Sequence, residues 1–255
     1  MCGNVRIRLG ADPDITGDPS MAESDFGIFG AAAASIKRGA TIGQTVPNGG
    51  GHFTFGFNSV SDGAMATGLY YNLTKFAPLR DDSDNATGGS VRCVMKRGPS
   101  AGSVLGYSVG LFINLTSTSE SYKGYLLGLS NDDPSSIILA KAAPIAGLDP
   151  TNSQTCLKLS SETFLVNTWV HLRLDSIVNP NGDVILKCFK NDLSINPCTS
   201  PNWQAIPGMD DYVDDALGVE SSTDPLAGGY GGWFFQSSLA QSRGFVDMFE
   251  MSRQM

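Results

Sequence analysis

From His52 onward, apolar residues alternate with polar or small residues, which is the period-two pattern of half-buried β-strands. Turn-forming clusters such as Asp81–Asn85 and Gly98–Ser100 separate the alternating segments. The pattern predicts strands at residues 53–57, 69–73, 91–95, 105–115, 122–129, 137–141, 156–159, 232–237 and 245–251. Many short strands with few helices predict an all-β fold, an antiparallel β-sandwich of jelly-roll type.

The clearest hairpin lies between Thr168 and Asp192. Its first strand alternates apolar residues at 170, 172 and 174 with Trp169, His171, Arg173 and Asp175 on the other face. The sequence Asn-Pro-Asn-Gly at 179–182 supplies the turn, because proline presets φ and the final glycine can adopt a positive φ.

The first 51 residues differ from the rest, since they are rich in Gly, Ala and Asp and show little strand alternation. We interpret residues 1–51 as an extended N-terminal arm and residues 52–255 as the sandwich domain. Two short helices are predicted as well. The capping-box sequence at Ser20–Glu23 predicts a helix reaching Lys37, and the segment after Pro207-Gly208 predicts a helix over Met209–Leu217.

Charge and composition exclude several classes of protein. The net charge of -8 leaves no basic face for nucleic acid. We find neither a signal peptide nor a stretch apolar enough to cross a membrane, so we expect a protein made in the cytoplasm. The five cysteines contain no C-x-x-C pair, which indicates a reducing compartment and no zinc site.

Three segments carry a recognisable pattern: the strand Trp169–Leu174 before its turn, the stretch Gly229–Phe234, and the closing strand Phe245–Met251. In this order they resemble the concanavalin A-like lectin/glucanase (LamG-like) sandwiches. The resemblance covers about residues 53 to 255 and implies a jelly-roll fold. The arm, the low charge and the Gly/Ser/Thr/Asn-rich composition also resemble the virion proteins of tailed bacteriophages.

No catalytic residues are predicted. Glucanases that resemble this chain carry paired carboxylates as E-x-D-x-x-E, whereas the five glutamates here lie thirty or more residues apart. A literal G-x-S-x-G occurs at Gly106–Gly110, but it falls inside an alternating strand rather than on the strand-to-helix turn that a serine nucleophile needs.

No metal or cofactor is predicted. His52 and His171 are the only histidines, and we interpret His171 as a packed or exposed sandwich residue and not as a ligand or base. Four aspartates, at 210, 211, 214 and 215, lack the spacing of a calcium loop, so they are better explained as a solvated helix face.

Carbohydrate binding has candidates in the loops. Lectin-like sandwiches bind sugars through an aromatic platform beside polar groups, and Trp203, Tyr212 and Tyr230 lie in Gly/Pro/Asp-rich segments near Asp210 and Asp211. We expect Trp169 and Trp233 to be core residues instead, because both lie in strands.

The sequence therefore favours a non-enzymatic structural component of a phage-like virion, a head decoration, neck or tail protein. On this hypothesis residues 1–51 mediate self-assembly and contacts with other virion proteins. The alternative is a lectin-type module that binds host-surface glycan, and the third hypothesis is a glycoside hydrolase with atypical carboxylates.

Overall fold

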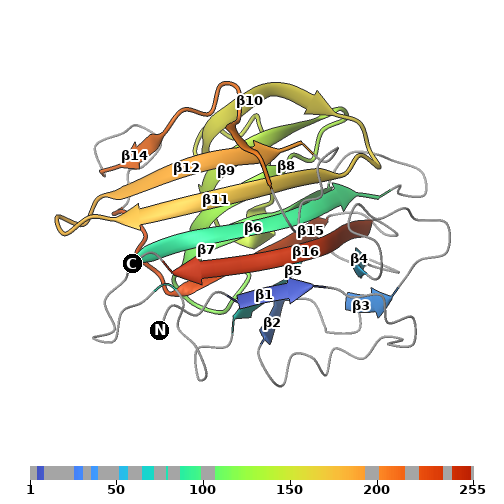
Figure 1. Ribbon diagram of the computed structural model, residues 1–255, viewed down its shortest axis with the longest axis horizontal. Helices are drawn as coiled ribbons and strands as arrows, with labels where there is room; N and C mark the ends of the chain where they lie inside the picture. Colours follow the sequence, from blue (N-terminus) through green and yellow to red (C-terminus); the bar gives the residue numbers. More distant parts are fainter. Residues whose placement is uncertain are drawn as a thin grey trace.

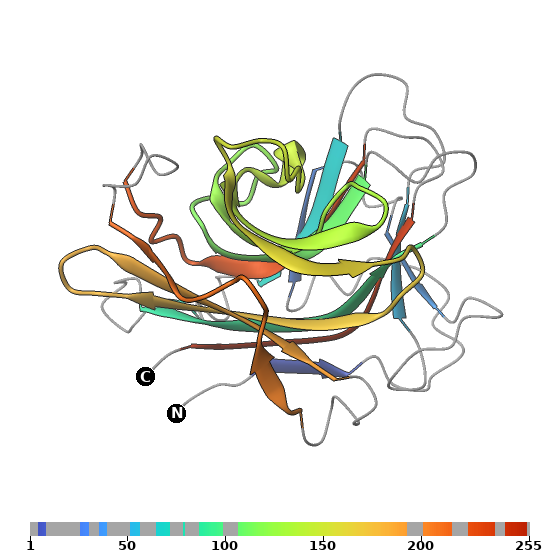
Figure 2. The ribbon, with the colours of Figure 1, turned by 90° about the horizontal axis from the view of Figure 1, so that it is seen from above.

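The computed structural model describes residues 5–8, 26–30, 36–39, 52–56, 65–71, 79, 87–98, 107–192, 201–215, 224–237 and 243–253. Most of them lie in two antiparallel sheets that pack face to face (Figures 1 and 2). The predicted all-β sandwich is therefore confirmed. Across these ranges the only helical segment is the 3₁₀ turn η3, Pro144–Ala146. No helix within them is long and apolar enough to span a bilayer.

Sheet A contains nine strands. They are β1 (Val5–Arg8), β3 (Ile36–Gly39), β4 (His52–Gly56), β6 (Gly88–Arg97), β11 (Val170–Val178), β12 (Val184–Asn191), β13 (Trp203–Ala205), β14 (Tyr212–Asp214) and β16 (Arg243–Arg253). Their order is β13-β12-β11-β6-β16-β4-β3, with β1 beside β16 and β14 beside β12.

Sheet B contains seven strands in the order β10-β9-β8-β7-β15-β5-β2. They are β2 (Phe26–Gly30), β5 (Met65–Tyr71), β7 (Tyr107–Leu115), β8 (Gly124–Leu129), β9 (Ser135–Ala142), β10 (Cys156–Phe164) and β15 (Tyr230–Ser237).

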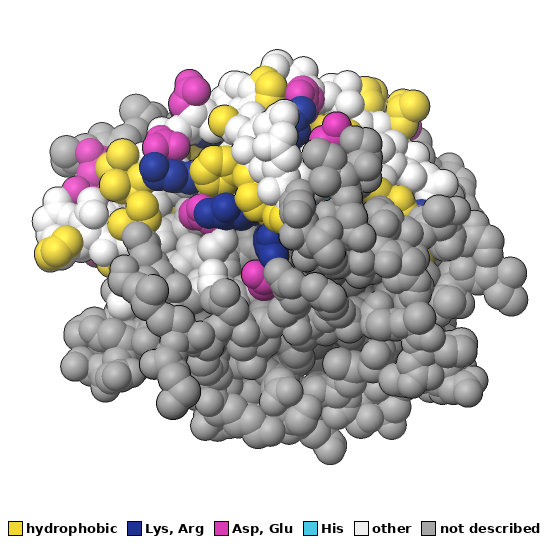
Figure 3. All heavy atoms as spheres, viewed as in Figure 1, with side chains coloured by type: hydrophobic (Ala, Val, Ile, Leu, Met, Phe, Trp, Pro, Cys, Tyr) yellow, Lys and Arg dark blue, Asp and Glu magenta, His cyan; other side chains and the backbone are white. Residues whose placement is uncertain are grey.

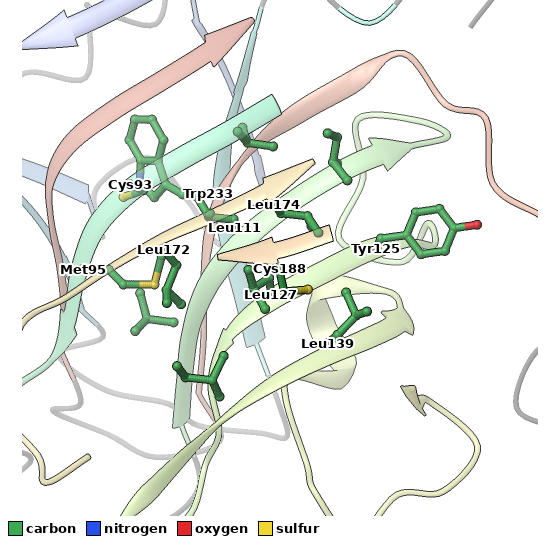
Figure 4. Packing of buried hydrophobic residues seen from close by; sticks show 14 of the residues in the cluster. Cys93, Met95, Leu111, Tyr125, Leu127, Leu139, Leu172, Leu174, Cys188 and Trp233 are labelled. Atoms are coloured by element: carbon green, nitrogen blue, oxygen red, sulfur yellow. The ribbon is translucent and has the colours of Figure 1, made fainter. Parts of the chain in front are cut away.

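The main hydrophobic core lies between the sheets (Figure 4). Sheet A contributes alternate residues such as Leu172 and Leu174, and sheet B contributes Leu111, Leu127 and Trp233, all fully buried. The alternation read from the sequence therefore identifies the inward face of β11, as the pleat requires.

A second, smaller core covers the outer face of sheet B. Phe112, Leu126 and Phe234 alternate with the inward residues of their strands and pack with Leu148, which follows η3. Gly128 is required here, because a Cβ at this position would lie 2.2 Å from the carbonyl oxygen of Val109 on the neighbouring strand. Sheet B is thus buried on both faces in this region.

The predicted hairpin is confirmed as β11 and β12, which pair from His171–Asn191 to Val178–Val184. In the turn the Gly182 N–H donates to the Asn179 carbonyl at 2.9 Å, and Gly182 has the expected positive φ, +97°. The turn is therefore set by local sequence.

Both predicted helices are wrong where the structure describes them. The interval from Ser20 to Lys37 contains β2, paired with β5, and the start of β3, paired with β4. The interval Met209–Leu217 contains β14, which pairs with β12. Long-range pairing outweighs the local helix signals at both places.

The N-terminal strands belong to the sandwich. Within residues 1–51, β1 pairs with β16 of sheet A, β2 with β5 of sheet B, and β3 with β4 of sheet A. The proposed boundary near residue 51 falls at the edge of a stretch outside the described ranges, so the division into arm and domain remains a prediction.

A buried ion pair joins the two sheets. Lys141 Nζ of β9 lies 2.6 Å from Asp214 Oδ2 of β14, with their side chains 2% and 0% exposed. The Tyr125 hydroxyl of β8 donates to the same oxygen at 2.6 Å and accepts the Leu226 N–H at 2.9 Å. Burial and the bond to Asp214 raise the pKa of Tyr125, so it stays a hydrogen-bond donor.

We expect Asp214→Asn to lower the free energy of unfolding by about 3 kcal/mol or more, because it removes the negative charge from a fully buried ion pair and leaves the Lys141 charge in place. Asp211→Asn is the matched control. Asp211 Oδ2 pairs with Lys187 Nζ at 3.1 Å, but its side chain is 59% exposed, so its loss should cost less than about 1 kcal/mol. Urea unfolding at pH 7 measures both, and equal shifts in the two variants would contradict the assignment.

Candidate functional site

A pocket of about 200 Å³ opens on the outer face of sheet A. The residues that line it come from β6, β11, β13 and β16; they are Ser90, Arg92, Arg173, Trp203, Glu250 and Ser252. We call it the Trp203 pocket. Figure 3 shows this face of the molecule, where Lys and Arg side chains gather beside acidic and hydrophobic ones.

Strand register explains why these side chains meet. Arg92 on β6 pairs directly with Arg173 on β11 and with Glu250 on β16. Ser90 lies two residues earlier on β6 and pairs with Ser252. Residues two apart share a face of a sheet, so the charged row and the serine row lie side by side on the outer face.

Trp203 is positioned by β13, where it pairs with Asn191 at the end of β12. Its ring centroid lies 4.5 Å from that of His171. The guanidinium carbons of Arg92 and Arg173 lie 5.8 and 5.7 Å from the same ring centroid. The indole is thus held by packing and by two cation–π contacts.

Ion pairs hold the two arginines in place. Arg92 Nη2 lies 2.6 Å from Glu250 Oε2, and these side chains are 11% and 13% exposed. Arg173 Nε donates to Asp175 Oδ1 at 2.7 Å, and its Nη2 donates to the other carboxylate oxygen. A guanidinium bound along one edge keeps a fixed orientation, which suits a preorganised binding site.

His171 supports the pocket from beneath Trp203 and is 1% exposed. The side-chain oxygen of Asn191, Oδ1, accepts the Asn202 backbone N–H at 2.6 Å, so the side-chain nitrogen Nδ2 faces His171 Nδ1 at 3.2 Å. His171 Nδ1 is therefore the acceptor, and the ring proton lies on Nε2. Burial, with a smaller effect from the positive charge of Arg92, lowers the pKa of His171 to about 3. The ring is neutral at physiological pH.

The sequence-predicted sugar residues do not form one cluster. Trp203 lines the pocket, whereas Asp210 and Asp211 are exposed just before β14 and Tyr212 begins that strand, half-buried against the main core. Tyr230 begins β15 of sheet B and packs against the second core. Trp203 is thus the candidate that lies in a pocket.

The acidic group at 210–215 is divided by the fold. Asp211 pairs with Lys187 at the surface, and Asp214 is buried against Lys141. Within the described ranges, no group of three or more His, Cys, Asp or Glu side chains is arranged to hold a metal ion.

The G-x-S-x-G serine lies in the middle of β7. Ser108 is fully buried, accepts the Leu148 N–H at 3.2 Å, and donates to Gln236 Oε1 at 3.4 Å. It therefore lies in a continuous strand and is fully enclosed, unlike a nucleophile on an exposed turn.

Sequence reasoning did not select Arg92, Glu250 or the two serines. One signal was available for Arg173, because the alternation places it on the polar face of its strand together with His171 and Asp175. Nothing local indicated that β6 and β16 are neighbours, since Arg92 and Glu250 are 158 residues apart.

The sequence matches no protein-family model and no curated protein. Solved structures nevertheless share the fold. A mutant of the alginate lyase Aly36B in complex with alginate trisaccharide gives a TM-score of 0.53 at 12% identity, over 99% of this chain and 98% of that chain. The potassium-bound carbohydrate recognition domain of Emp46p gives 0.50 at 10% identity, over 96% and 95%. These likenesses confirm the concanavalin A-like sandwich as the fold.

His171 should make the protein less stable in mild acid. Its pKa is lower in the folded state than the ordinary value of 6.5, so its contribution is complete above pH 6.5 and declines as the pH falls toward 3. Between pH 7 and pH 5 we expect a loss of about 2 kcal/mol from this residue alone.

The measurement is urea unfolding at several pH values for the wild type and His171→Gln. His171→Gln should flatten the pH dependence of the free energy of unfolding in this range, whatever its effect at pH 7. If the free energy of unfolding of His171→Gln falls with pH as steeply as that of the wild type, the imidazole is not held neutral in the folded protein.

Proposed function

We propose that the protein is a lectin-type carbohydrate-binding module and that it binds sugar in the Trp203 pocket. The observation that carries this proposal is the convergence of one indole, two guanidinium groups, one carboxylate and two hydroxyls on a single pocket. All these side chains project from paired strands, which position them more rigidly than loops do.

The pocket chemistry matches what a pyranose offers. A sugar ring has C–H groups that pack on an aromatic side chain, and hydroxyls that need both donors and acceptors. Trp203 supplies apolar surface, the arginines donate, and Glu250 and the serines accept. Hydrogen bonds to charged groups are stronger than neutral ones and more directional in arginine forks.

The size of the pocket favours a single sugar ring. Pockets for drug-sized ligands measure roughly 300 to 1,000 Å³. At about 200 Å³ the Trp203 pocket is smaller, so we infer that it takes one residue of a glycan.

The fold supports the proposal indirectly. The similar Emp46p structure is a carbohydrate recognition domain, and the similar Aly36B structure holds an alginate trisaccharide. At 10% and 12% identity, these two likenesses support a fold that other proteins use for carbohydrate ligands. No residue role is carried over from either structure.

We infer binding without catalysis. Glu250 is the only carboxylate among the described residues that line the pocket, and it is paired with Arg92. Most glycoside hydrolases use a second carboxyl group across the bond. The fold alone does not distinguish a carbohydrate-binding module from an enzyme, since Aly36B is a lyase. The virion role stays a prediction from the sequence.

We expect the full-length protein to bind a glycan on an array of neutral and acidic sugars, and Trp203→Ala to weaken the best interaction at least about tenfold by calorimetry. The matched control is Trp169→Ala. Trp169 is also half-buried but contacts Lys96 and Phe245 instead of lining the pocket.

Trp169→Ala should change affinity less than about twofold, and circular dichroism should confirm that both variants fold. Glycan binding that survives Trp203→Ala in a folded protein would reject the pocket. An array without any positive glycan would reject the function.

A further inference from the structure

Two arginines on adjacent strands converge on one side of the Trp203 pocket. Arg92 and Arg173 are direct register partners, and both guanidinium carbons lie within 6 Å of the centroid of the same indole ring. Like charges brought together in a partly buried site repel each other, and here each arginine is paired with its own carboxylate, Glu250 or Asp175.

Each arginine is held by a carboxylate on one edge only. Arg173 uses Nε and Nη2 to bind Asp175, and Arg92 uses Nη2 to bind Glu250. A guanidinium carries five N–H donors, so these bonds leave donors on both groups. Among them is Arg92 Nε, which is buried and has no hydrogen-bond partner in the described part of the chain.

Both arginines are already paired with a carboxylate, Arg92 with Glu250 and Arg173 with Asp175, so the charges of these four side chains sum to zero. The ion pairs therefore leave unused donors at the pocket, and no excess charge. A carboxylate presents two acceptor oxygens in one plane, whereas a neutral hydroxyl presents one oxygen, so a carboxylate can accept from both guanidinium groups at once.

We propose that the pocket recognises a carboxylated sugar, a hexuronic acid residue, whose carboxylate lies against Arg92 and Arg173 and whose ring packs beside Trp203. This rests on the proposed function and narrows its ligand from carbohydrate in general to uronic acids. Planar arginine forks match a carboxylate, and the hydroxyls of Ser90 and Ser252 line the same pocket, where they can bond the ring hydroxyls.

The overall negative charge of the protein further limits the kind of ligand that can bind. A negative chain repels a long polyanion at a distance, so recognition depends on contact inside the pocket. A terminal uronic acid residue fits these conditions better than the interior of a long acidic polysaccharide, and the pocket volume of about 200 Å³ agrees with one ring.

The test compares matched sugars on the full-length protein. Calorimetry measures the affinities of the methyl glycosides of glucuronic, galacturonic and mannuronic acid, each beside its C6 methyl ester and its neutral hexoside. Esterification removes the charge and leaves the ring intact. At least one free acid should bind tenfold or more tightly than its ester and its hexoside.

Two variants then identify the positive side chain that recognises the sugar carboxylate. Arg173→Gln should remove the preference for the free acid. Lys187→Gln removes one positive charge from β12, outside the pocket lining, and should leave the preference intact. The wild-type comparison of acid and ester needs no variant, so it decides the question even if Arg173→Gln folds poorly.

Failure of this inference can be told from failure of the proposed function. Equal binding of acid, ester and hexoside, lost in Trp203→Ala, would overturn the uronic acid assignment and leave carbohydrate binding in place. Absence of binding by every sugar in the panel would also overturn the assignment, and the glycan array then decides the proposed function separately. A preference that survives Arg173→Gln and disappears in Lys187→Gln would place the charge recognition elsewhere.

Discussion

The register of three central strands of sheet A, β11, β6 and β16, determines both the core and the pocket. Facing the core, Leu174, Val91 and Met251 form one row across these strands. A slip of one residue in any strand would turn its apolar stripe outward and bury charged residues in its place. An unpaired charge in the interior costs several kcal/mol, so the core register also fixes the row Arg173, Arg92 and Glu250 on the outer face.

The two sheets differ in what their outer faces carry. Sheet B has the second core on its outer face, with Phe112 and Phe234 fully buried, so its central strands are apolar on both sides. Sheet A alternates apolar and polar residues in β11, which lines the pocket, and in its neighbour β12. The polar functional groups therefore gather on sheet A, where the pleat places them away from the core.

Charged residues have two distinct uses in this protein. Lys141 and Asp214 form a fully enclosed pair that links strands of opposite sheets, and Tyr125 satisfies the same carboxylate oxygen. Such a pair is costly to break and has no access to a ligand. Arg92 and Arg173 are only partly enclosed, and their carboxylate partners orient them without using all their donors. Burial thus separates charges that hold the fold from charges that can bind.

Local pattern in the sequence determined the sandwich class, the inward face of β11, and the β11–β12 hairpin with its turn at 179–182. It also selected Trp203, an aromatic residue in a polar segment. The order of the strands was decided only by the tertiary structure. Backbone pairing between distant segments brought Glu250 to Arg92, converted the two predicted helices into β2, the start of β3 and β14, and placed Asp214 in the interior. An irregularity in β16 likewise keeps both Val246 and Phe249 buried although they are three residues apart. Alternation reports the environment of each strand and says nothing of its neighbours, because the energy of a sheet lies in contacts between residues far apart in the chain.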